Sequence, residues 1–247
     1  MTTHHFKIFF ILIGFFLAGI FDSPGSVAVY DADEYLYYGT YNSGRNLLYV
    51  GVNDLTTGSP YQYHFNFGAV QFDLAGLSAG GTSYLQLNLM RFRIPGPVVP
   101  NGPPSYTYAT SGYSFDLKVV ALGADFSEAG NLSGSDLQEW YTSNLWNRPT
   151  VGIMNFNSAG AVSLDVSSAV DAWLANPASN FGFGLVGVSS GTQGLTAQFY
   201  STENTVSSSN APALIPEPSN LALWGFGHLF LFWLFSNENC FSDSNET

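Results

Sequence analysis

Short apolar runs separated by turn residues fill most of the chain between positions 29 and 214. Residues 84–89 alternate apolar and polar side chains strictly, as a strand with one buried face does. Further short apolar runs stand at 47–51, 69–74, 115–120, 181–186 and 198–200. Many short strands between turns are typical of two packed sheets, so the pattern predicts an all-β fold, a jelly-roll β-sandwich.

Two segments have a helical period instead, and the sequence therefore predicts short helices at 135–141 and 166–174. Val166, Val170 and Trp173 recur at the spacing of one helix face, and this spacing assigns Trp173 to the core. Asp165 stands directly before them as the natural N-cap. The Pro- and Gly-rich stretch at 94–105 predicts a long surface loop, because proline does not pair within a central strand.

The composition supports a folded β domain without a basic surface. Aromatic residues make up 16% of the chain and charged residues only 10%, which excludes a disordered chain. Between positions 29 and 215 there are 13 acidic and five basic residues, a net charge of −8, so nucleic acid is not an expected partner. The sole cysteine is Cys240, so the β domain has neither disulfides nor a cysteine metal site.

The N-terminus has the three parts of a signal peptide. Lys7 precedes an apolar run at 8–21, and small residues (Ser-Val-Ala) follow at 26–28. The apolar run is shorter than the roughly 20 residues that a membrane span needs. We therefore expect a signal peptide over 1–28, cleaved by signal peptidase after Ala28, and export of the chain. An uncleaved N-terminal anchor is the alternative.

The C-terminal segment, 215–247, begins with two prolines around a glutamate and continues into a second apolar run at 221–235. Pro216, Glu217 and Pro218 before this run resemble the PEP-CTERM sorting signal of Gram-negative bacteria that make extracellular polysaccharide. The resemblance implies an outer-surface or secreted location and processing by an exosortase-type enzyme, with the C-terminal helix in the membrane until then. The family's terminal arginine cluster is replaced here by an acidic tail, and a plain membrane anchor is the alternative.

The segment between the two ends resembles a second family. Residues 164–174 (Leu-Asp-Val-Ser-Ser-Ala-Val-Asp-Ala-Trp-Leu) and 180–185 (Asn-Phe-Gly-Phe-Gly-Leu) are similar to the "DVT..V..W … NYGF.L" segment of DNRLRE-type domains. Weaker matches follow in the same order along nearly all of 29–214. These domains belong with carbohydrate-binding modules known for alginate recognition. The resemblance thus implies a jelly-roll domain over 29–214 and a carbohydrate ligand.

Catalytic chemistry finds little support in the sequence. His64 is the only histidine between the two ends, and it lies in an aromatic run without a nucleophile elbow. Paired carboxylates could hydrolyse a glycan, but no motif assigns them roles. We therefore expect a protein that is not an enzyme.

Three acidic residues near the start of the domain could hold a cation. Asp31, Asp33 and Glu34 crowd together, and hard carboxylate oxygens are the ligands that Ca²⁺ prefers. Their spacing is not that of an EF-hand, and Asp31 could instead cap a turn. A calcium ion and a turn cap both stay open, and no other cofactor is expected.

Sugar rings stack on flat aromatic side chains, and polar groups fix their orientation. The candidate stacking residues come from three segments: Tyr35, Tyr37, Tyr61, Tyr63, Trp140 and Trp146. Arg91 and Arg93 stand at strand spacing, so they are expected to share one face and to form a clamp for an acidic sugar.

The sequence thus predicts a non-enzymatic exported surface or extracellular-matrix protein associated with polysaccharide, with a carbohydrate-binding face. A purely structural or adhesive surface protein without a specific glycan is the alternative. A polysaccharide-degrading enzyme ranks last.

Overall fold

The computed structural model of the chain describes residues 26–35, 42–43, 46–51, 66–96, 105–190, 194–204 and 208–216. Of residues 26–35, 42–43, 189–190 and 208 only the backbone is described. These residues belong to a compact unit that spans Gly25–Pro216. Among them, no helix has the length and apolarity needed to cross a membrane.

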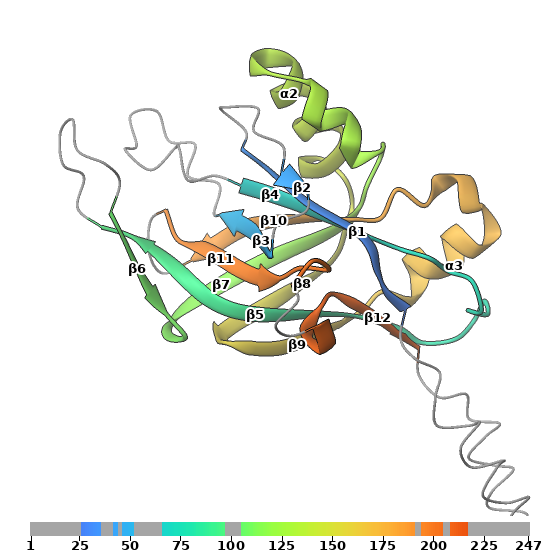
Figure 1. Cartoon of the computed structure of the whole chain (residues 1–247). Coiled ribbons are helices and arrows are strands. Elements are labelled where there is room, and N and C mark those ends of the chain that lie inside the picture. Colours follow the sequence, from blue (N-terminus) through green and yellow to red (C-terminus); the bar gives the residue numbers. More distant parts are fainter. Residues whose placement is uncertain are drawn as a thin grey trace, which may run out of the picture. The chain divides into compact units, whose positions relative to one another are not determined.

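The described residues form two antiparallel sheets (Figure 1). Sheet B has the order β2-β1-β4-β10-β7-β8, with β2 (Asn42–Ser43), β1 (Ser26–Tyr35), β4 (Asn66–Phe72), β10 (Phe183–Ser190), β7 (Ser111–Ala121) and β8 (Thr150–Ser158). Sheet A is built around β5 (Ser83–Pro95), with β3 (Leu47–Gly51), β11 (Thr196–Tyr200), β12 (Ala213–Pro216), β6 (Tyr106–Ala109) and β9 (Gly160–Asp165). The two-sheet, all-β architecture predicted from the sequence is confirmed.

Strand β1 belongs to both sheets. Its first residues, Ser26 and Val27, pair with Leu214 and Ala213 of β12, and the rest of β1 pairs with β4. The strand thus begins three residues before Val29, the first residue expected to follow signal-peptide cleavage. The segments 1–25 and 217–247 lie outside the described residues, so of the sorting motif only Pro216 is placed, at the end of β12 opposite Ser83.

Strand β5 is the central strand of sheet A, because each of its edges pairs with two strands in succession. β12 and then β11 pair along one edge, and β9 and then β6 pair along the other. The expectation of a loop from residue 94 is wrong at its start. Ile94 and Pro95 extend β5 and pair with Thr107 and Tyr106, because a hairpin partner accepts a proline at the strand end. Residues 97–104 lie outside the described part.

A β-bulge interrupts β5 and reverses which of its side chains face the core. Leu85, Leu87 and Leu89 point inward, and strict alternation would continue inward at residue 91. The pairing with β11 instead steps from Leu89 to Arg91, and Met90 is the extra residue of the bulge. Phe92 therefore points inward, and the positions on either side of it point outward.

The main core lies between the two sheets. Aromatic pairs bind its layers together: Phe183 of β10 packs against Trp173 with ring centroids 4.6 Å apart, and Phe156 of β8 packs against Phe199 of β11 at 5.1 Å. All four side chains are buried. Such contacts contribute to stability beyond the area they bury, and the pair of Phe156 and Phe199 joins sheet B to sheet A across the core.

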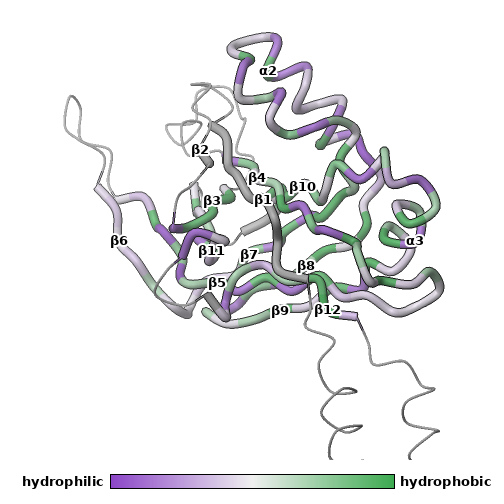
Figure 2. The backbone as a smooth tube through the Cα atoms, turned by 45° about the vertical axis from the view of Figure 1, so that its right-hand side comes forward, coloured by the Kyte–Doolittle hydropathy of each residue, from purple (hydrophilic) through white to green (hydrophobic). Residues whose placement is uncertain are grey.

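A second core covers the outer face of sheet B. It is formed by three consecutive helical segments, η2 (Phe126–Asn131), α2 (Gly134–Tyr141) and the π-helix η3 (Thr142–Trp146). Their apolar side chains pack on Phe67 of β4 and Val186 of β10. Figure 2 shows hydrophilic and hydrophobic positions interspersed along α2, as expected of a helix with one buried face.

Helix α3 (Ser167–Ala175) confirms the second helical prediction. Val170 and Trp173 lie in the main core. The side chain of Asp165 accepts hydrogen bonds from the hydroxyl and the backbone N–H of Ser167, and these bonds lower the pKa of the Asp165 carboxyl. The N-cap of α3 is Val166, so the prediction of Asp165 as the N-cap is wrong by one residue, because the helix begins one residue later than the apolar pattern suggests. Asp165 instead accepts the first helical N–H from the position before the N-cap.

Truncating an aromatic side chain of the main core tests its contribution to stability. Phe183→Ala is expected to lower the free energy of unfolding by about 3–5 kcal/mol, because it removes contacts with Trp173 and leaves a cavity. Ile153→Ala, on a side chain that is 43% exposed, is the matched control and is expected to change it by less than about 1 kcal/mol. Urea unfolding followed by circular dichroism gives both values, and equal losses would contradict this assignment of the core.

Candidate functional site

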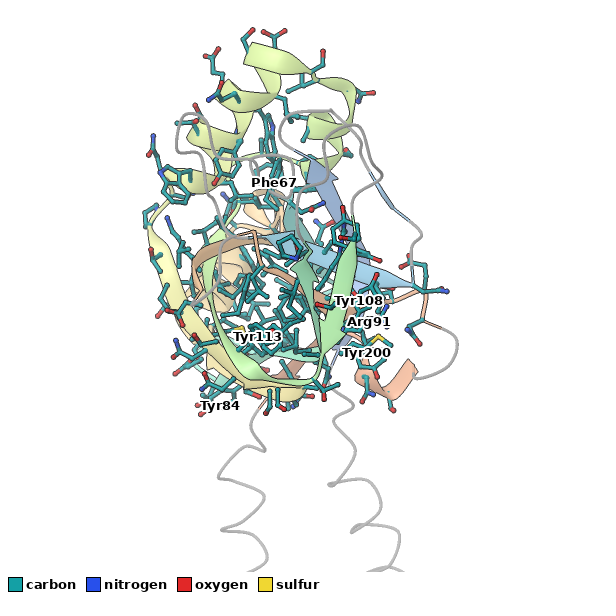
Figure 3. The ribbon with its side chains drawn as sticks, turned by 90° about the vertical axis from the view of Figure 1, so that its left-hand side faces the viewer. Phe67, Tyr84, Arg91, Tyr108, Tyr113 and Tyr200 are labelled. Carbon is teal, nitrogen blue, oxygen red and sulfur yellow. The ribbon has the colours of Figure 1, made fainter. Side chains whose placement is uncertain are left out.

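The outer face of sheet A gathers cationic and aromatic side chains from four neighbouring strands. We call this set the Arg–Tyr face: Arg91 and Arg93 of β5, Tyr106 and Tyr108 of β6, Tyr49 of β3, and Gln198 of β11. The register places them side by side, since Gln198 is opposite both Arg91 and Tyr49, and Arg93 is opposite Tyr108. Figure 3 shows Arg91 and Tyr108 together with Tyr200 on one side of the ribbon.

Arg91 is held between two neighbours. Its guanidinium carbon lies 4.1 Å from the centre of the Tyr108 ring, and its Nε donates a hydrogen bond of 2.7 Å to Oε1 of Gln198. No carboxylate of the described residues forms an ion pair with it. The two Nη groups of Arg91 donate no hydrogen bond within the described residues.

Arg93 is also packed against tyrosine rings. Its guanidinium carbon lies 3.6 Å from the centre of the Tyr106 ring and 6.0 Å from that of Tyr49. A cation over an aromatic face is attracted by the ring quadrupole, by about 0.5–1 kcal/mol at exposed sites. The tyrosines thus restrict both arginines to one orientation, which lowers the entropy that a ligand must remove.

Gln198 holds Arg91 in place at an energetic cost. Its side chain is 1% exposed, and its Nε2 has no hydrogen-bond partner. Arginine only donates, so the amide oxygen must face Arg91, and the amide nitrogen is left as an unpaired donor. A buried donor without a partner costs about 1–3 kcal/mol, which suggests that Gln198 is retained to orient Arg91 and not for stability.

This arrangement can bind an anion on a flat surface. The guanidinium fork matches the two oxygens of a carboxylate, and a tyrosine ring offers an apolar face next to it. Tyr108 is 52% exposed, which is enough for a ring to stack on it. The sequence prediction that Arg91 and Arg93 share a face agrees with their outward positions on either side of the buried Phe92.

Four of the other predicted site residues are tyrosines whose side chains the structure does not describe. Tyr37, Tyr61 and Tyr63 lie outside the described residues. Tyr35 is placed only by its backbone, in β1 opposite Asn66.

The predicted cation ligands Asp31, Asp33 and Glu34 also lie in β1, and only their backbone is described. Elsewhere in the described residues, no three acidic, histidine or cysteine side chains come together in a way that could hold a metal ion. Calcium binding at 31–34 therefore stays a prediction.

The assignment of Trp140 as a stacking residue is wrong. Its side chain is only 7% exposed, and its ring packs edge-on against Phe126 at 5.7 Å in the second core. Trp140 is buried because it lies on the apolar face of α2, together with Leu137 and Tyr141. A tryptophan on such a face packs inward.

Trp146 lies apart from the Arg–Tyr face. It ends η3, stacks on Tyr141 at 6.1 Å and is 37% exposed. The ammonium of Lys118 lies 5.4 Å from the centre of the Trp146 ring and donates a hydrogen bond of 2.7 Å to its backbone carbonyl. Burial lowers the pKa of Lys118. The structure therefore does not bring Trp146 together with Arg91 and Arg93.

Sequence reasoning missed four members of the Arg–Tyr face: Tyr49, Tyr106, Tyr108 and Gln198. A signal for two of them was present, since Tyr106 and Tyr108 repeat the two-residue spacing of Arg91 and Arg93 on the far side of the Pro- and Gly-rich stretch. A hairpin across that stretch would pair the two sets.

A comparison with protein-family models and with curated proteins finds no match to this chain. The functional interpretation therefore depends on the residues of the site themselves.

The role of Gln198 as a positioning residue can be separated from a structural role. Gln198→Met removes the unpaired donor and keeps the volume, so the free energy of unfolding is expected to change by less than about 1.5 kcal/mol. Phe199→Ala, at the next position of the same strand but facing the core, is expected to cost about 3–5 kcal/mol. Chemical denaturation measures both, and a loss as large for Gln198→Met would show that Gln198 serves the fold.

Proposed function

We propose that this chain is a non-enzymatic, exported surface or extracellular-matrix protein of a Gram-negative bacterium, and that it binds polysaccharide through the Arg–Tyr face. The observation that supports this most directly is the pair of arginines held outward by tyrosine rings and by Gln198. Two guanidinium groups at strand spacing suit a sugar polymer that carries carboxylates.

The acidic character of the chain argues for short-range recognition. With a net charge of −12, the protein as a whole repels an anionic polymer. Binding must then come from direct contacts, in which the guanidinium fork meets a carboxylate and the tyrosine ring meets the sugar. Rigid presentation matters most in such a case, and it is what the tyrosine stacks supply.

The proposal extends to the fold and to the location of the chain. The two-sheet sandwich is consistent with a jelly-roll domain of the DNRLRE type. Export would follow from the signal peptide over 1–28, and retention or release from the PEP-CTERM-like segment at 215–247 acting on an exosortase-type enzyme. Hydrolysis of any polysaccharide by the purified chain would contradict the non-enzymatic part.

A structural or adhesive role is the second candidate, and strand β8 favours it. β8 stands at the end of sheet B and contains neither a charged residue nor a proline. Such residues commonly protect edge strands from pairing with another chain. Self-association of the chain without any glycan binding would support this alternative.

The Arg–Tyr face is tested by binding an acidic oligosaccharide, such as a hexamer of galacturonic acid or of mannuronic acid. Arg91→Ala is expected to weaken binding roughly 10- to 100-fold, since a hydrogen-bonded charge contributes about 1.5–3 kcal/mol. Arg91→Lys keeps the charge but loses the fork, and is expected to recover only part of the affinity. Isothermal titration calorimetry at two salt concentrations measures both effects.

Arg148→Ala is the matched control for charge. Its Nε donates to the backbone carbonyl of Ala121, away from the Arg–Tyr face, so the affinity should stay within about twofold. Equal losses in the Arg91 and Arg148 variants would point to bulk charge and would count against the proposed site.

A further inference from the structure

A second exposed group of aromatic, aliphatic and polar side chains lies on the outer face of sheet B. We call it the Trp146 face: Trp146 of η3, Lys118 and Asp116 of β7, and Ile153 and Asn155 of β8. In the described residues, three large apolar side chains are exposed, namely Tyr108, Trp146 and Ile153. One belongs to the Arg–Tyr face and the other two to this one.

The register of β7 and β8 brings these side chains together. Lys118 is opposite Ile153 and Asp116 is opposite Asn155, while the intervening pair, Leu117 and Met154, faces the core. All four therefore point outward. Successive outward positions of a strand lie about 7 Å apart, so the face has the dimensions of one or two sugar rings.

The tryptophan is presented rigidly. The π-helix η3 is anchored by Leu145, which is fully buried, and by a hydrogen bond of 2.9 Å from the backbone N–H of Asn147 to the carbonyl of Thr142. Tyr141 stacks against the Trp146 ring, and the carbonyl of Trp146 is tied to Lys118. A π-helix is a rare conformation that is frequent at functional sites, and here its last residue carries the exposed ring, next to Lys118 of β7.

The polar groups of the face are fixed and carry opposite charges. The side-chain amide of Asn155 donates a hydrogen bond of 2.7 Å to Oδ1 of Asp116, which holds the carboxylate in place. Lys118 is two residues further along the same strand, so the positive and the negative charge offset each other locally. The chemistry is that of a neutral polyhydroxyl ligand, whose hydroxyls both donate and accept, and whose apolar face stacks on an indole ring.

We propose that the Trp146 face binds a neutral pyranose segment, and that the chain bridges two polysaccharide strands with its two outer faces. This inference rests on the proposed function, since the bridge needs the Arg–Tyr face as its other half. The two faces belong to different sheets and point away from the core between them. They also differ in chemistry, one being suited to an acidic sugar and the other to a neutral one.

The test uses the full chain in mild detergent with two sets of probes. The neutral probes are hexasaccharides of β-1,4-linked glucose and of β-1,4-linked mannose, and the acidic probe is a hexamer of galacturonic acid. Trp146→Ala is expected to weaken binding of a neutral probe about tenfold or more, with the acidic probe unaffected. Arg91→Ala combined with Arg93→Ala is expected to do the opposite.

Further variants separate binding from folding. Trp146→Phe keeps a flat ring and should recover most of the affinity for the neutral probe. Asn155→Ala removes the hydrogen bond that fixes Asp116 and should weaken neutral binding several-fold. Asp136→Asn, at an exposed position of α2 outside both faces, is the control and should leave both affinities unchanged. Thermal unfolding confirms that each variant folds.

Bridging has its own measurement. Light scattering on mixing the chain with a neutral and an acidic polysaccharide should rise for the wild type, and should be lost when either face is mutated. If the affinity for the neutral probes is unchanged in the Trp146→Ala and Asn155→Ala variants, the inference is overturned and the proposed function stays intact. If the acidic probe does not bind, or binds equally well to the Arg91 variant, the proposed function is overturned and the bridge with it.

Discussion

The bulge at Met90 is the feature on which the arrangement of sheet A depends. Without it, the alternation set by Leu85, Leu87 and Leu89 would carry Arg91 into the core. Burying a guanidinium among apolar side chains without a charged partner costs several kcal/mol. The bulge avoids this cost by shifting the phase of the strand, so that Phe92 fills the core and the arginines reach the surface. The same strand therefore stabilises the sandwich with one half and presents charge with the other.

The shift is visible in the sequence, because apolar residues occupy the odd positions up to Leu89 and the even positions from Met90 to Ile94. The sequence alone therefore predicts the strands with strong alternation, both helices and the outward position of the arginines. It did not suffice for β8 and β9, which the apolar pattern left unassigned. In β8 the outward Ile153 stands next to the inward Met154, and this pair breaks the period of two that identifies a strand.

The aromatic candidates show the limit of local pattern more clearly. Trp140 and Trp146 are six residues apart and look alike in the sequence, yet one is buried and the other is exposed. Six residues at 3.6 per turn already place the two rings about 120° apart around a regular helix axis, and between them α2 changes into the π-helix η3, which ends at Trp146. No short window of sequence predicts that change. Likewise, Gln198 becomes recognisable only when the register places it opposite Arg91.

The places where the chain departs from the most stable choice are also the places where its two faces lie. Three such departures are the unpaired amide nitrogen of Gln198, the exposed indole of Trp146 and the exposed branched side chain of Ile153. The first lowers stability relative to an apolar side chain of the same size, and the other two lower solubility relative to a polar side chain. A sandwich with two aromatic-filled cores can tolerate such departures. Natural sequences tend to break local rules at functional sites and to compensate elsewhere. Since these departures fall on the outer faces of two different sheets, they are more readily explained by two ligand contacts than by one.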